Sequence, residues 1–91
     1  METTTTRTPL DQLAWTLIAG MGEDEPVDAA LLRANRAGRE WDWQGARDAI
    51  EEAYRAVGSE APAGIDHGYA WHCGTHPIQV RARELREAHR I

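Results

Sequence analysis

The sequence DWQGARDAIEEAYRAVG, residues 42–58, carries the most regular apolar pattern of the chain. Side chains spaced three and four residues apart lie on one face of an α-helix. In this segment the apolar face consists of Trp43, Ala46, Ile50, Ala53, Tyr54 and Val57. Asp42 suits the N-cap position, and Gly58 suits the position after the last turn. We therefore expect an amphipathic helix over 43–57 whose apolar face packs against other helices.

Two further amphipathic patterns precede this helix. The first follows Thr8 and Pro9, which provide a side-chain cap and a residue suited to the first helical position, and it ends at the glycines of 20–22. The second begins at Pro26 and ends at Gly38. Both patterns place small or aliphatic side chains at helical spacing, so each predicted helix has one face to bury.

These patterns predict an all-α fold, a small three- to four-helix bundle with a helix-turn-helix-like C-terminal part. Residues 1–7 form a disordered tail, and residues 8–91 form a single helical domain. Within this domain we expect a three-helix platform over 8–58, a glycine-rich loop over 59–74 and an arginine-rich helix over 75–91. Because the helices are short and rich in alanine, a homodimer would add apolar burial.

The chain has a formal net charge of −5, and the charge is unevenly distributed. Residues 1–66 carry an excess of acidic side chains, whereas residues 67–91 carry an excess of arginines. All ten basic residues are arginine, and together with the abundant alanine this composition suggests a GC-rich source, such as an actinobacterium or one of its phages. The acidic part of the chain would repel nucleic acid and could suit a basic protein partner.

The composition also indicates the cellular compartment in which the protein is expected. A single cysteine excludes an intrachain disulfide and favours a reducing, cytoplasmic environment. The chain has no run of 18 apolar residues, so we expect no membrane span. Its N-terminus also lacks the basic and apolar segments of a signal peptide.

The C-terminal segment 71–91 concentrates the residues that could carry chemistry. A helix is expected from Pro77, capped by one of the two residues before it. Arg83, Arg86 and Arg90 then share one face of this helix. An exposed arginine face can lie against phosphates, although such a face can also be a solvated surface with ordinary charge pairs.

The same segment resembles a known class of DNA-binding proteins. Cys73-Gly74-Thr75 and the run RARELREAHRI of 81–91 resemble the end of small helix-turn-helix or winged-helix proteins of phages and plasmids. The resemblance implies a regulator of phage or mobile-element origin that contacts double-stranded DNA with its last helix. The DNA contacts implied by this resemblance are Arg81, Arg83, Arg86 and Arg90.

A function of a different class is also consistent with the sequence. The acidic helices could bind a host protein, so that the chain acts as a non-enzymatic interaction module or inhibitor. The candidate contact residues of that module are Glu23, Asp24, Glu25 and Trp15.

Trp41 and Trp43 are interpreted as packing residues at a helix entry rather than as a stacking platform for bases. The sequence lacks a catalytic set and a phosphate-binding glycine loop, so we predict neither an enzyme nor a cofactor.

One cluster of histidine and cysteine residues leaves several interpretations open. His67, His72, Cys73 and His76 show the spacing H-x4-H-C-x2-H, and these residue types are zinc ligands. No Cys-x-x-Cys pair is present, which favours surface histidines beside a buried thiol over a metal site. Cys73 and a neighbouring histidine could form a nucleophile and base, although the sequence supplies no third, orienting group. Residues 69–73 alternate in part and could form a short strand.

Overall fold

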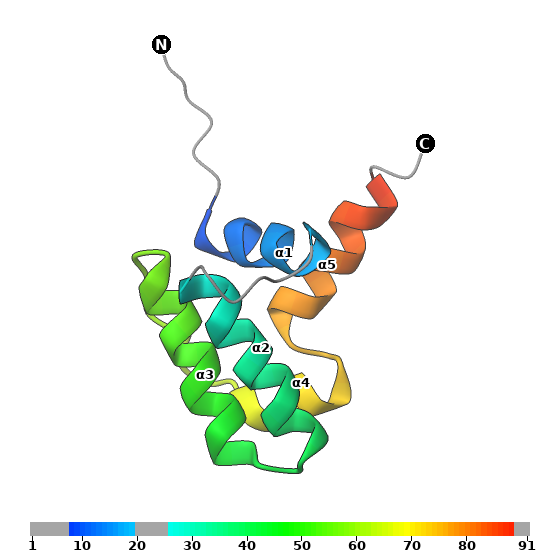
Figure 1. Cartoon of the computed structure of the whole chain (residues 1–91). Coiled ribbons are helices and arrows are strands. Elements are labelled where there is room, and N and C mark those ends of the chain that lie inside the picture. Colours follow the sequence, from blue (N-terminus) through cyan, green and yellow to red (C-terminus); the bar gives the residue numbers. More distant parts are fainter. Residues whose placement is uncertain (1–7, 20–25, 89–91) are drawn as a thin grey trace.

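The computed structural model describes residues 8–19 and 26–88, which form five α-helices and, within these ranges, no β-strand (Figure 1). The helices are α1 (Pro9–Ala19), α2 (Pro26–Arg39), α3 (Trp43–Ala56), α4 (His67–Cys73) and α5 (Pro77–Ala88). The predicted all-α fold is therefore confirmed. Residues 1–7, which were predicted to form a tail, the acidic residues 23–25 and Arg90 lie outside the described residues.

Helices α2 and α3 form an antiparallel hairpin, and the two share the most extensive helix–helix interface of the structure (Figure 1). The apolar faces predicted for both helices meet there, with Leu31 and Ala34 of α2 buried beside Ile50 and Ala53 of α3. Asp42 caps α3 as predicted, because its carboxylate accepts a hydrogen bond from the backbone N–H of Gly45 at 2.9 Å.

Helix α1 lies across one end of this hairpin, and α5 packs against α1 (Figure 1). Leu13 of α1 and Ile78 of α5 reach the main core, whereas Ala14, Ala82 and Leu85 form a second, smaller apolar cluster. The helix caps were partly predictable, since Thr8 accepts a hydrogen bond from the backbone N–H of Asp11, as the sequence indicated. Through the smaller apolar cluster, the C-terminal helix α5 docks on the N-terminal helix α1.

Helix α4 occupies residues of the segment that was predicted to be a loop, 59–74, and it replaces the strand considered for 69–73. The helix begins after Asp66, whose carboxylate accepts a hydrogen bond from the backbone N–H of Tyr69, and ends at Gly74, which adopts a left-handed φ of 78°. A helix this short offers too few positions for an apolar period, so packing against α2 and α3 stabilises it.

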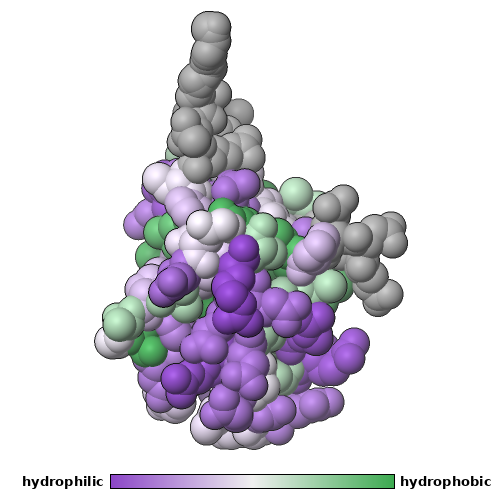
Figure 2. Space-filling view, turned by 90° about the vertical axis from the view of Figure 1, so that its left-hand side faces the viewer, coloured by the Kyte–Doolittle hydropathy of each residue, from purple (hydrophilic) through white to green (hydrophobic). Residues whose placement is uncertain are grey.

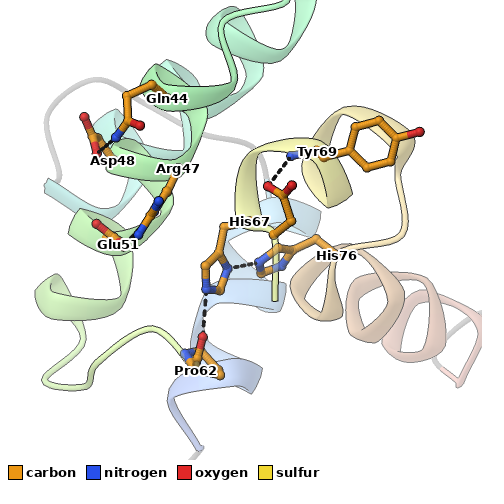
Figure 3. Close-up of polar contacts among 9 residues, drawn as sticks. Gln44, Arg47, Asp48, Glu51, Pro62, His67, Tyr69 and His76 are labelled. Atoms are coloured by element: carbon orange, nitrogen blue, oxygen red, sulfur yellow. Dashed lines mark hydrogen bonds and ion pairs between the residues drawn. The ribbon is translucent and has the colours of Figure 1, made fainter. Parts of the chain in front are cut away.

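The surface on the α3 side of the molecule is mostly hydrophilic (Figure 2). Exposed charged and polar side chains of α3 interact there, as in the ion pair between Arg47 and Glu51 and the hydrogen bond from Gln44 to Asp48 (Figure 3). Pairs of this kind on a solvated helix contribute a few tenths of a kcal/mol each. Among the described helices, none is long and apolar enough to cross a membrane.

Candidate functional site

The first predicted DNA contact, Arg81, is held by carboxylates of the protein itself. Its Nε lies 2.7 Å from Oδ1 of Asp11 on α1, and its Nη1 lies 3.2 Å from Oε1 of Glu84. The hydrogen bond with Asp11, followed by the one with Glu84, raises the pKa of Arg81. This guanidinium therefore links α1 to α5, and a phosphate would have to compete with two carboxylates for it.

The other predicted contacts on α5 are more accessible. Arg83 is exposed and donates a hydrogen bond to the carbonyl oxygen of Gly74 at 3.0 Å, at the end of α4. Arg86 is exposed, and in the described part of the chain no residue forms an ion pair with it. Arg90 lies outside the described residues, so the predicted face is represented here by Arg83 and Arg86.

The residues proposed for protein interaction are only partly described. Glu23, Asp24 and Glu25 lie outside the described residues. Trp15 is half-buried and packs against the smaller apolar cluster between α1 and α5. It therefore lies at the edge of the interface between these two helices.

Two of the four clustered side chains, His67 and His76, form a buried hydrogen-bonded pair (Figure 3). Nδ1 of His67 lies 2.7 Å from Nε2 of His76, and Nε2 of His67 lies 2.9 Å from the carbonyl oxygen of Pro62. At the other end, the backbone N–H of Ile78 donates to Nδ1 of His76 at 3.2 Å. His76 thereby caps α5, while the side chain of Gln79 accepts a hydrogen bond from the backbone N–H of His76.

These partners determine the tautomer of both rings. The amide of Ile78 can only donate, so Nδ1 of His76 carries no proton and Nε2 of His76 donates to His67. The carbonyl of Pro62 can only accept, so Nε2 of His67 carries the proton of that ring. Both rings are neutral in this arrangement. Burial, followed by the electrostatic influence of His67, lowers the pKa of His76 to about 4.

The remaining two members of the cluster face away from this pair. Nδ1 of His72 donates to the carbonyl oxygen of Gly38 at 3.1 Å, and Cys73 is exposed. The expectation of surface histidines beside a buried thiol is therefore wrong for the thiol and for the buried His67 and His76. Within residues 8–19 and 26–88, no three histidine, cysteine or acidic side chains are grouped so that they could bind a metal ion. The sequence cluster is thus divided between a buried pair and the surface.

His72 belongs to a group of aromatic side chains at the surface, which we call the aromatic patch. Its members are Trp41, Trp43, Tyr69 and His72. The ring centroid of His72 lies 4.5 Å from that of Trp41 and 4.7 Å from that of Trp43, and the two tryptophan rings are 5.5 Å apart. Tyr69 meets Trp43 edge-to-face at 6.0 Å. The patch joins the α2–α3 turn to the outer side of α4.

Trp41 is more exposed than the other tryptophan and the tyrosine of the patch, with 69% of its surface accessible. It is also the one non-glycine residue in the described ranges with positive φ, 62°. A left-handed backbone costs an L-residue about 1–2 kcal/mol, and large side chains rarely adopt it. The interpretation of Trp41 as an ordinary packing residue therefore needs correction, because it is strained and open to solvent, whereas Trp43 is half-buried and packs against three other rings.

A hollow of about 320 Å³ opens beside the aromatic patch, between α2, α4 and the start of α5. It is lined by Asn35, Gly38, Arg39, Trp71, His72 and Gln79. His72 contributes to both the hollow and the patch, so the two form one continuous surface feature. We take this combined surface as the candidate functional site.

The sequence contained only partial signals for this site. Asp66 and Gly74 are good capping residues that could have indicated α4, and with it the exposed side of that helix. Nothing local indicated that Trp41 and His72 would meet, since long-range packing brings them together. Comparison of the chain with protein families, with characterised proteins and with solved structures finds no match.

Proposed function

We propose that this protein is a non-enzymatic interaction module that binds a partner protein through the aromatic patch. The observation that carries the proposal is Trp41, which is strained in the left-handed region and yet 69% exposed. Strained residues concentrate at functional sites, because there the rest of the fold offsets their cost. Tryptophan and tyrosine are also the residues most enriched among those that dominate binding energy in protein interfaces.

The charges around the patch favour a protein over a nucleic acid. Glu40 and Asp42 flank Trp41 in the chain, and Asp66 caps the helix that carries Tyr69 and His72, whereas Arg39 is the nearest arginine in sequence. Surfaces that stack nucleic-acid bases combine aromatic side chains with a positively charged groove. The formal net charge of −5 further opposes binding to phosphates.

The proposal can be tested by selecting binding peptides from a random display library on the immobilised wild-type protein. Each recovered peptide is then measured against Trp41→Ala and against Val80→Ala, a matched control at an exposed apolar residue on α5. We expect Trp41→Ala to weaken binding by about 2 kcal/mol or more, roughly 30-fold, as for a central interface tryptophan. Val80→Ala should change the affinity less than twofold. Peptides that bind both variants equally well would contradict the proposal.

A second candidate function, DNA binding, rests on the connection between α4 and α5. Residues 74–76 join these helices, and Gly74 in the left-handed conformation resembles the glycine-containing turn of helix-turn-helix motifs. Fluorescence anisotropy with random duplex DNA tests it. Phosphate binding by Arg83 and Arg86 would fall steeply between 50 and 300 mM salt, whereas no binding at about 50 mM salt would reject the DNA hypothesis.

A further inference from the structure

The hollow beside the aromatic patch has hydrogen-bond acceptors that are already occupied from within the protein. Oδ1 of Asn35 accepts from the indole N–H of Trp71 at 2.9 Å, and the carbonyl oxygen of Gly38 accepts from His72 at 3.1 Å. Oε1 of Gln79 accepts from a backbone N–H at 3.1 Å, and the carbonyl oxygen of Trp71 accepts from the side chain of Gln79 at 3.0 Å. A ligand that donates hydrogen bonds would find these acceptors engaged.

Two hydrogen-bond donors that line the same hollow, by contrast, are unpaired in the described part of the chain. The indole N–H of Trp71 can only donate, so it fixes Oδ1 of Asn35 toward Trp71 and leaves the Nδ2 amide group directed elsewhere. Neither this amide group nor the guanidinium of Arg39 has a hydrogen-bond partner among residues 8–19 and 26–88. The hollow therefore offers one cationic and one neutral donor to a ligand that carries acceptors.

We infer that the hollow receives a carboxylate of the partner, from an acidic side chain that neighbours an aromatic side chain stacked on Trp41. This inference rests on the proposed function, because it assigns a chemical class to the partner segment. A carboxylate presents two acceptor oxygens, and arginine pairs with it through two parallel N–H groups. The aromatic neighbour follows from Trp41, whose exposed ring is available to another planar side chain.

The spatial relation of the two subsites supports a single short segment as the occupant. His72 lines the hollow and contacts the Trp41 ring at a centroid distance of 4.5 Å. Arg39 is two residues from Trp41 in the chain. Consecutive Cα atoms are about 3.8 Å apart, so an acidic residue and its aromatic neighbour can reach both subsites when the segment bends and presents both side chains to one surface.

Nuclear magnetic resonance titrations of the full chain test the inference with two neutral-capped dipeptides, Ac-Tyr-Glu-NH2 and Ac-Tyr-Gln-NH2. We expect the glutamate peptide to shift the Trp41 indole signal and the side-chain signals of Asn35 and Arg39. The glutamine peptide, which lacks only the charge, should bind about tenfold more weakly. Arg39→Gln should remove this preference for glutamate, whereas Arg36→Gln, an exposed arginine one turn away on α2, should retain it.

The outcomes separate this inference from the proposed function. Peptides that perturb Trp41 equally with glutamate or glutamine, and equally in Arg39→Gln, would overturn the carboxylate assignment and leave the aromatic patch as a binding surface. An identical loss of preference in Arg36→Gln would also overturn it, because the effect would then be general electrostatics. If neither peptide perturbs Trp41, and no displayed peptide depends on Trp41, both proposals fail together.

Discussion

The two sides of α4 show how one short helix can serve the core and the surface with similar residue types. Its inner side carries His67 and Trp71, which are 4% exposed each, whereas its outer side carries Tyr69 and His72, which are exposed. The buried side-chain nitrogens of the inner side all have hydrogen-bond partners, as do all buried side-chain nitrogens and oxygens of the described residues. On the outer side aromatic rings pack against one another in tilted and edge-to-face arrangements, and donors of the neighbouring hollow remain available.

The difference indicates which side stabilises the fold and which side is available for binding. Trp71 is packed in the main core and its indole N–H is bonded to Asn35, so its burial contributes to folding. Trp41 exposes most of its surface and holds the backbone in an unfavourable region, so its contribution to folding is small. Binding to a partner would bury the Trp41 surface that folding leaves open.

The largest expected effect comes from replacing these two tryptophans in turn. Trp71→Ala should lower the free energy of unfolding by about 3–5 kcal/mol, because it leaves a cavity and an unpaired Asn35 oxygen. Trp41→Ala should cost less than about 1.5 kcal/mol, the typical value of aromatic ring contacts. Trp41→Gly should cost even less, because glycine relieves the left-handed strain.

Urea unfolding followed by circular dichroism measures this comparison. Because a small domain has only about 5–15 kcal/mol of stability, Trp71→Ala could leave too little folded protein to analyse. Trp71→Phe then serves as a milder variant, which keeps a smaller aromatic ring but loses the hydrogen bond to Asn35. Equal losses for Trp41→Ala and Trp71→Ala would contradict the division of α4 into a core side and a binding side.

The same division explains how much of the molecule was predictable from sequence. The buried faces of α2 and α3 and the caps Thr8 and Asp42 follow from local periodicity and capping chemistry, and they were predicted. The hydrogen bond between Trp71 and Asn35 spans 36 positions in the chain, so no local pattern indicates it. The conformation of Trp41 likewise depends on how the α2–α3 turn closes against α4. The site therefore arises from tertiary packing.

The pairing of His67 with His76 predicts an acid-labile core, the second largest effect. Burial lowers the pKa of His76 from 6.5 in the unfolded chain to about 4, so between these values the unfolded state binds more protons. The stabilisation is complete above pH 6.5, declines as the pH falls from 6.5 to 4, and amounts to at most about 3 kcal/mol. Protonation of Nδ1 in His76 would also break the hydrogen bond from Ile78.

Unfolding free energies measured from pH 7.5 to pH 4 in the wild type and in two variants isolate this contribution. His76→Gln should show a shallower pH dependence, because glutamine can cap α5 but does not titrate. His72→Gln alters an exposed histidine of the outer side and should retain the wild-type slope. The same slope in all three proteins would show that carboxylates elsewhere, rather than the histidine pair, govern the acid sensitivity.

The smallest expected effect concerns the docking of α5 on α1 through Arg81 and Asp11. Their side chains are 36% and 25% exposed, and ion pairs this accessible contribute about 0.2–1 kcal/mol. A double-mutant cycle with Arg81→Gln and Asp11→Asn should give a coupling energy in that range, decreasing with added salt. Arg86→Gln on the same helix is the matched control and should leave stability within about 0.5 kcal/mol. A coupling energy near zero would mean that apolar packing, in the smaller cluster and at Ile78, holds α5 in place without this ion pair.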